Sequence, residues 1–116
     1  MTGMDLDRWL SQLRKGSLEM VVLATLADQR LYGLEILERL ASLGVPEGTL
    51  YPLLNRLHKG GWLESEWETR DSGHPRRYYR LSESGRRRAT EMIRRWRAYS
   101  DDVEELTRQL LEGGTR

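Results

Sequence analysis

The chain has 116 residues, no cysteine and a formal net charge of only +1. This length suits one domain with a modest core, and the lack of cysteine excludes a disulfide framework or a thiolate metal site. The N-terminus MTGMDLDRWL is too acidic for a signal peptide, and no apolar run approaches the roughly 18 residues of a membrane helix, so we expect a cytoplasmic protein without membrane contact.

The N-terminal part of the chain predicts three helices. Apolar side chains first recur at helical spacing after Asp5, at Leu6, Trp9, Leu10 and Leu13. We expect Gly16 to end this short helix and Ser17 to cap a second, largely buried one. A third helix, with its apolar residues between 34 and 41, should close at Gly44 and form the first half of a helix-turn-helix pair.

The segment EGTLYPLLNRLHKGG predicts the second helix of that pair. Its apolar face consists of Leu50, Leu53, Leu54 and Leu57, and its opposite face of Thr49, Tyr51, Pro52, Asn55, Arg56 and Lys59. Pro52 lacks an N–H and would crowd the carbonyl of Gly48 in a helix that began at Glu47. We therefore expect the helix to start at Thr49, with an irregular first turn.

Two stretches with period-two alternation follow, at residues 63–69 and 76–81, joined by a loop over 70–75. They predict an antiparallel hairpin, which would be the wing of a winged helix-turn-helix. We assign Leu63, Trp67, Tyr79 and Leu81 to the core rather than to a nucleic-acid contact, whereas Tyr78, on the opposite strand face, could have either role.

Ser82 should cap a final helix of almost thirty residues, roughly 40 Å long. Such a helix extends beyond a domain of this size, and a second copy of the same helix is the simplest partner for its far half. The expected architecture is mainly α with a small β-hairpin: an N-terminal, dimer-supporting helix (1–16), a winged helix-turn-helix (17–81) and a C-terminal dimerisation helix and tail (82–116). A two-fold dimer would place its recognition helices about 34 Å apart and favour an inverted-repeat operator.

The charges are unevenly distributed. Ten arginines and three acidic residues lie between Arg70 and Arg97, a local balance of +7, whereas residues 101–116 hold five acids and two arginines. A basic segment of this kind is typical of a polyanion-binding surface, although an arginine-rich helix face can also be simply solvated. Charge alone leaves both interpretations open.

The segments LYGLEILERL, EGTLYPLLNRL, GWLESEW and GHPRRYYRLSESG resemble the PadR-type transcriptional regulators, and the similarity extends into the last helix. The combination of EGTLYP with the Gly-x-Pro-Arg-Arg-Tyr-Tyr-x-Leu hairpin is much more specific than a generic helix-turn-helix pattern. The resemblance implies a dimeric, usually repressing, bacterial or archaeal regulator of the compact branch, with a C-terminal dimerisation helix. Some members are released from DNA by small aromatic or drug-like effectors. Pro46 departs from the polar capping residue common in relatives.

Carried onto this chain, the resemblance implies that one helix face contacts double-stranded DNA, through Thr49, Tyr51, Pro52, Asn55 and Arg56. Asn55 could pair with adenine, and Arg56 with guanine or phosphate. The alternative is that Tyr51 packs under the wing and Arg56 is a solvated cation. In the wing we expect Arg70, His74, Arg76 and Arg77 to contact phosphates or the minor groove, the alternative being a plain charged hairpin tip.

Trp96 lies midway along the last helix, where two symmetry-related indoles could stack a planar aromatic effector. The commoner role for such a residue is an interface anchor. A catalytic group could be sought at Asp71, Ser72 and His74, which are close together in the sequence, but it would lack oxyanion donors, so we predict no enzyme. The two histidines, His58 and His74, are too few for a metal site. We predict no cofactor. The main alternative to a DNA-binding repressor is a winged-helix adaptor that binds proteins through its long helix.

Overall fold

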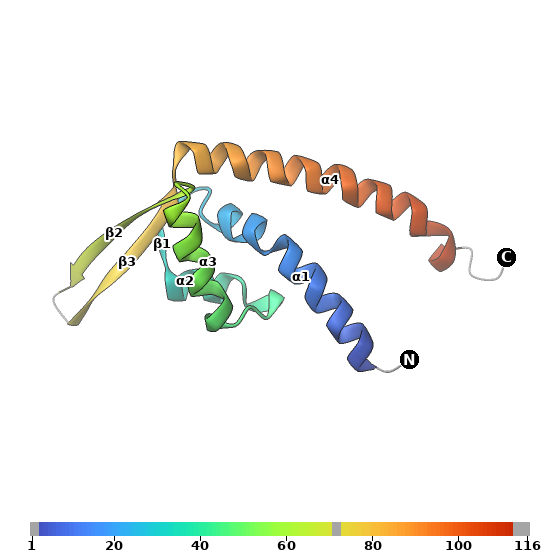
Figure 1. Cartoon of the computed structure of the whole chain (residues 1–116), viewed down its shortest axis with the longest axis horizontal. Helices are drawn as coiled ribbons and strands as arrows, with labels where there is room; N and C mark the ends of the chain where they lie inside the picture. The colour runs from blue at the N-terminus through green and yellow to red at the C-terminus, as the bar shows by residue number, and fades with distance from the viewer. Residues whose placement is uncertain (1–2, 71–72, 113–116) are drawn as a thin grey trace.

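The computed structural model describes residues 3–70 and 73–112 of the chain. The elements in chain order are α1 (Gly3–Thr25), β1 (Leu31–Tyr32), α2 (Gly33–Arg39), a 3-10 turn η1 (Ala41–Leu43), α3 (Glu47–Lys59), β2 (Leu63–Arg70), β3 (Gly73–Leu81) and α4 (Glu83–Glu112). Figure 1 shows the sheet, α2 and α3 at one end of an elongated molecule of 65 × 32 × 20 Å. The helices α1 and α4 leave this end and diverge from each other. Within the described ranges, no helix is long and apolar enough to cross a membrane.

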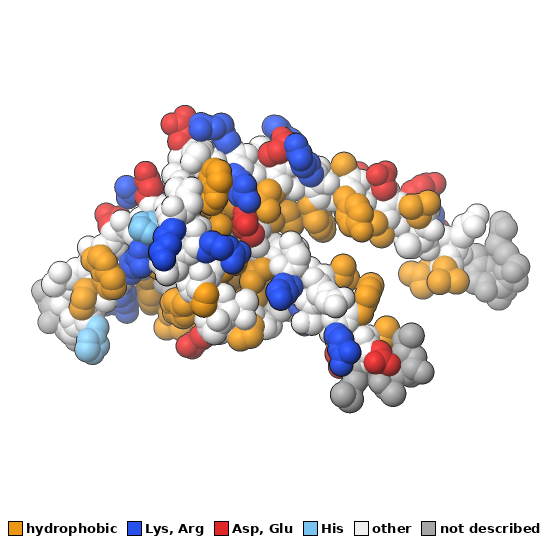
Figure 2. Space-filling view, in the orientation of Figure 1, with side chains coloured by type: hydrophobic (Ala, Val, Ile, Leu, Met, Phe, Trp, Pro, Cys, Tyr) orange, Lys and Arg blue, Asp and Glu red, His pale blue; other side chains and the backbone are white. Residues whose placement is uncertain are grey.

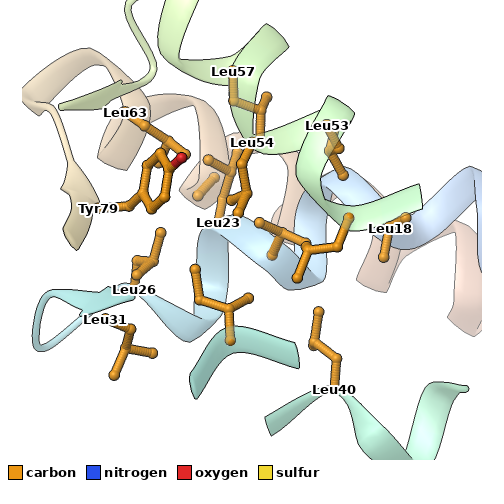
Figure 3. Packing of buried hydrophobic residues seen from close by; sticks show 14 residues of the cluster. Leu18, Leu23, Leu26, Leu31, Leu40, Leu53, Leu54, Leu57, Leu63 and Tyr79 are labelled. Carbon is orange, nitrogen blue, oxygen red and sulfur yellow. The ribbon is translucent and has the colours of Figure 1, made fainter. Parts of the chain in front are cut away.

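One hydrophobic cluster holds the sheet end together, and we call this part the body (residues 18–92). Every helix and strand of the body contributes to the cluster (Figure 3), and its largest fully buried side chains are Val22, Leu23, Leu26, Ile36, Leu50, Leu54, Leu57 and Leu63. Burial of a leucine contributes roughly 1.5–3 kcal/mol, so this cluster is the main source of the body's stability. Among the described residues, none of the buried ones is polar or charged.

The predicted wing is present as the antiparallel hairpin β2–β3, with Leu63 opposite Leu81 and Trp67 opposite Arg77. The strands extend further than predicted, to Arg70 and from Gly73, so the loop is shorter than residues 70–75. Residues 71–72, at its tip, lie outside the described ranges. A short strand that we did not predict, β1, pairs with β3 and gives the sheet order β1-β3-β2. Two residues are too few for a period-two pattern to be recognised.

The predicted core positions of the hairpin are correct for Leu63 and Tyr79, which are buried, and Leu81 is half-buried against the cluster. The prediction is wrong for Trp67, whose side chain is 67 % exposed. The alternation along β2 is real, but the strand extends beyond the core before it reaches Trp67. A shared strand face therefore does not ensure shared burial.

The two predicted N-terminal helices are a single helix, α1, which runs through Gly16 without a break. The Ser17 hydroxyl does not cap a new helix, because it donates to the carbonyls of Leu13 and Arg14 in the preceding turn, each at 3.2 Å. A single glycine inside a helix costs only about 1 kcal/mol relative to alanine. Packing of the second half of α1 in the core is sufficient to offset that cost.

The second helix of the predicted helix-turn-helix pair, α3, begins earlier than predicted. The predicted first helix of the pair is the α-helix α2 followed by the 3-10 turn η1, and Gly44 closes it as expected, with a φ of 66° in the left-handed region. α3 then starts at Glu47 with Pro46 as its N-cap, not at Thr49. The Pro46 carbonyl accepts from the N–H groups of both Thr49 and Leu50, at 3.0 Å each. Pro52 is tolerated because it deprives only the exposed first turn of one hydrogen bond.

The final helix, α4, has 30 residues and is capped as predicted by Ser82, whose hydroxyl accepts from the Gly85 N–H at 2.9 Å. The same hydroxyl lies 2.6 Å from the Gly61 carbonyl, to which it can donate. Gly85 packs so closely that a Cβ there would lie 1.9 Å from the Trp62 carbonyl oxygen. These contacts fix the start of α4 on the body. We call residues 3–16 of α1 and 93–112 of α4 the arms.

Candidate nucleic-acid interface

α3 separates its two faces as the sequence predicts. Its four leucines, at positions 50, 53, 54 and 57, are buried in the core. All five residues predicted to contact DNA from this helix are exposed: Thr49, Tyr51, Pro52, Asn55 and Arg56. The helix therefore presents a polar, hydrogen-bonding surface to solvent on a rigid apolar base.

Tyr51 packs against the body and is still partly exposed. Its ring packs on Gly33 at the start of α2, rather than under the wing, and a Cβ at Gly33 would lie 2.4 Å from its Cε1 atom. The ring nevertheless remains 43 % exposed. Burial raises the pKa of the Tyr51 hydroxyl, and Glu47 and Tyr79 raise it further, so the phenol keeps its proton and can donate a hydrogen bond.

The outward face of the wing carries a network of ion pairs. Glu66 accepts from Arg30 at 3.0 Å and from Arg80 at 3.3 Å, Glu68 accepts from Arg30 at 2.7 Å, and Glu64 accepts from Arg80 at 3.0 Å. These side chains are about half exposed, so each pair stabilises the fold only weakly. Their effect on the interface is that Arg30 and Arg80 are already neutralised.

Arg76 lies on the same outward face, where its guanidinium packs on an aromatic ring instead of pairing with an acid. Its guanidinium is 4.3 Å from the centre of the Tyr32 ring. Tyr32 meets Tyr78 edge to face at 5.5 Å, and Arg30 lies 4.1 Å from the centre of the Tyr78 ring. Tyr78 is thus half-buried in this stack. Among the described residues, Arg76 makes no ion pair, so the stack orients a cation whose charge is still available.

Arg77 points to the opposite face of the hairpin and joins it to α3. Its guanidinium donates to the Ser65 hydroxyl, at 3.1–3.2 Å, and its NH2 group lies 3.2 Å from His58 Nδ1. The other ring nitrogen of His58 lies 3.2 Å from the same hydroxyl. Sequence reasoning missed this triangle, because the separation of His58 from Arg77 along the chain indicates no contact. It ties the wing to the C-terminal end of the recognition helix.

The remaining predicted wing residues gather near the hairpin tip. Arg70, His74 and Arg76 line one open hollow of about 290 Å³ together with Gly73 and Pro75. Asp71 and Ser72, which we considered as neighbours of a catalytic histidine, lie outside the described residues. In Figure 2, Lys and Arg side chains gather where α3 meets the strands of the wing.

The arginines of α4 are mostly engaged. Arg87 pairs with Glu83 and Arg95 with Glu91 along the helix, and Arg88 pairs with Glu19 of α1. Arg86 donates to the carbonyl of Ala27 at 2.7 Å. In this basic segment, Arg80 and half of the helical arginines are therefore ion-paired, whereas Arg70, Arg76 and Arg77 of the wing make no ion pair with any other described residue.

The arms carry a different surface. Their exposed large apolar side chains are Leu6, Trp9, Leu10 and Leu13 in α1, and Trp96, Tyr99, Val103, Leu106, Leu110 and Leu111 in α4. Hydrophobic side chains are visible along both arms in Figure 2. Trp96 is 48 % exposed within this set. Exposed large apolar side chains recurring along a helix are typical of a surface that binds a partner.

The helix pair α2–α3, followed by a β-hairpin that is joined to the recognition helix, defines a winged-helix fold of the DNA-binding type. A model of the transcriptional regulator PadR-like family matches residues 22–91. The chain is also 34 % identical over 106 residues to the transcriptional regulator Rv3488 of Mycobacterium tuberculosis. The aligned region covers 90 % of this chain and 92 % of that protein. The protein belongs to the PadR-like family of transcriptional regulators.

Solved structures agree with this assignment. A PadR family transcriptional regulator from Eggerthella lenta superposes with a TM-score of 0.81 at 36 % identity, covering 90 % of this chain and 93 % of that one. Bacillus subtilis PadR, solved in complex with operator DNA, shares the fold with a TM-score of 0.61 at 21 % identity, covering 66 % of this chain and 45 % of that one.

Proposed function

We propose that this regulator binds an inverted-repeat operator as a homodimer and represses transcription of a nearby operon. The observation that carries this proposal is the exposed polar face of α3, joined to a wing in which Arg70 and Arg76 make no ion pair with any other described residue. A rigid helix can read base edges, and the adjacent cations can bind phosphates on the flanking backbone. For such a DNA-binding regulator we propose a location in the cytoplasm of a bacterial or archaeal cell.

In this proposal α3 supplies specificity. Asn55 and Arg56 are exposed on adjacent positions of the helix, where an amide can pair with adenine and a guanidinium with guanine or phosphate. Thr49, Tyr51 and Pro52 lie on the same face, nearer the N-terminus of the helix. Tyr51 is held by its packing on Gly33 and can donate its hydroxyl to the backbone of the duplex.

The wing supplies affinity with little sequence information. Arg70, His74 and Arg76 surround one hollow and suit a phosphate group. Arg77 is occupied by Ser65 and His58, so its role in binding DNA is chiefly to hold the wing in place, with the rest of its guanidinium turned towards phosphate.

Dimerisation uses the arms. We assign residues 1–16 and 82–116 to dimerisation and 17–81 to DNA binding, with the continuous helix α1 shared between them. The apolar side chains of both arms would be covered by a second copy, and the two-fold axis would set the distance between the two recognition helices. Trp96, half-exposed on α4, would lie near that axis and could stack a planar aromatic effector.

Binding to the DNA upstream of its own gene tests the proposal. Asn55→Ala should reduce discrimination between that DNA and a scrambled duplex roughly tenfold, because one bidentate base contact is lost. Arg76→Ala should instead weaken binding to both duplexes and lower the slope of affinity against salt by about one. Arg87→Ala, which removes an exposed arginine already paired with Glu83, is the matched control and should bind as the wild type does. Equal binding of wild type to both duplexes, with capture of a protein partner through α4, would favour the adaptor function.

Repression and effector release need separate measurements. A reporter fused to the same promoter should rise in expression when the gene is deleted and fall when it is restored. An effector can release DNA only if it binds the DNA-free dimer more tightly than the DNA-bound dimer. Calorimetry of aromatic compounds with both forms checks this, and Trp96→Ala should abolish the difference. Equal affinity for the two forms would rule out the proposed release.

A further inference from the structure

Trp67 is an exposed indole in the wing that the packing of the body does not explain. Along the same face of β2, Leu63 is 2 % exposed and Ser65 is half-buried, whereas Trp67 is 67 % exposed. Exposed large aromatic side chains tend to mark binding surfaces. The other exposed tryptophans, Trp9 and Trp96, belong to the arms, which run away from the wing (Figure 1). A second copy of the chain seated on the arms would therefore not cover Trp67.

The surroundings of Trp67 indicate what does cover it. Its register partner is Arg77, whose guanidinium lies 5.9 Å from the indole ring. Arg77 and Ser65, on this same strand face, contact His58 at the end of α3. The indole therefore lies on the side of the hairpin that faces the recognition helix. Among the described residues, the guanidinium of Arg77 makes no ion pair, so an occupant of this side meets positive charge as well as an aromatic surface.

We propose that Trp67 is a DNA-contact residue, which packs its indole on a deoxyribose of the backbone and donates its Nε1–H to a phosphate oxygen. This inference rests on the proposed function and adds a residue to that interface. A tryptophan suits the role because one part of the ring system is apolar and the other is a hydrogen-bond donor. Arg77, His58 and Ser65 act as positioning residues, since they fix the strand that carries the indole relative to α3.

The contact is to the backbone, so it should carry little sequence information and no charge. In the full-length protein, Trp67→Ala should therefore lower affinity for the operator and for a scrambled duplex to the same extent, by roughly tenfold, without changing the salt slope. Trp67→Phe should restore most of the affinity, because it keeps an aromatic surface. Thr69→Ala, which removes an exposed side chain from the same strand, is the matched control and should bind as the wild type does.

Fluorescence gives a second readout that a merely structural role would not change. DNA should quench part of the tryptophan emission of the wild type, and this part should disappear in Trp67→Phe although that variant still binds. Melting temperatures of all variants show whether the body remains folded. Wild-type affinity in folded Trp67→Ala, or unchanged quenching in Trp67→Phe, would overturn this inference and leave the proposed function standing. Failure of the wild type to bind any duplex would overturn both.

Discussion

The body and the arms of this protein bury their apolar side chains to very different extents. In the body, leucines such as Leu50 and Leu54 are completely buried in one cluster, whereas Leu106 and Leu111 of the C-terminal arm are 84 % and 91 % exposed. Both sets lie on amphipathic helices, so helical pattern alone does not separate them. The difference shows that the body buries its apolar faces in its own core, whereas the arms leave theirs exposed, as the proposed dimer would need.

The largest expected effect comes from the centre of the body. Leu54→Ala should lower the free energy of unfolding by roughly 2–5 kcal/mol, because it removes buried apolar surface and leaves a cavity. Urea denaturation at fixed protein concentration measures the change. The same truncation at Leu111, in the arm, should alter the stability of the body by no more than about 0.5 kcal/mol. Equal losses in the two variants would contradict the distinction between body and arm.

A charge placed in the arm should separate assembly from folding. Leu106→Asp would bury an unpaired carboxylate in the proposed dimer interface and should yield monomers at micromolar concentration. Sedimentation velocity reports the assembly state, and far-ultraviolet circular dichroism reports the fold. Gln109→Asp adds the same charge at a polar position in the same turn and should remain dimeric. If Leu106→Asp stays dimeric, the apolar stripe of α4 is not the interface.

A smaller effect is expected where the body meets the C-terminal arm. Ser82→Ala should cost about 1 kcal/mol, because it removes the N-cap of α4 and a contact to the Gly61 carbonyl. Thr90→Ala removes a hydroxyl that, among the described residues, bonds only within the same helix, to the Arg86 carbonyl, and it should change stability much less. Thermal unfolding of both variants compares the two hydroxyls. Similar losses would mean that the cap does not help to attach α4 to the body.

The smallest effect, and the one of opposite sign, is expected in α1. Gly16→Ala should stabilise the protein by roughly 0.4–1 kcal/mol, because alanine favours the helix and a Cβ at this position has no atom within 4 Å. The measurement is again thermal unfolding. A loss of stability would show that the chain needs a flexible break between the N-terminal arm and the body, as the position of Gly16 in the sequence predicts.

Much of the interface could be predicted from local patterns. The leucine spacing of α3 correctly separates its buried face from the exposed Asn55 and Arg56, and the alternation after Gly61 correctly predicts the hairpin. The errors occur where a local signal competes with packing. Gly16 and Pro52 are helix breakers by propensity, yet both lie inside helices, because the helical segment that follows each of them is anchored in the core, from Leu18 and from Leu53.

The sequence by itself determined the helix pair and the hairpin that follows it, the amphipathic face of α3 with its exposed polar residues, and the capping of α4, because these depend on residues close together in the chain. Only the tertiary structure decided that Arg77 is joined to His58, that Arg30 and Arg80 are neutralised, that Tyr32 orients Arg76 and that Trp67 is exposed. Each of these facts depends on the distance between elements far apart in sequence. That distance is set by how the core packs, and a period of two or of 3.6 carries no information about it.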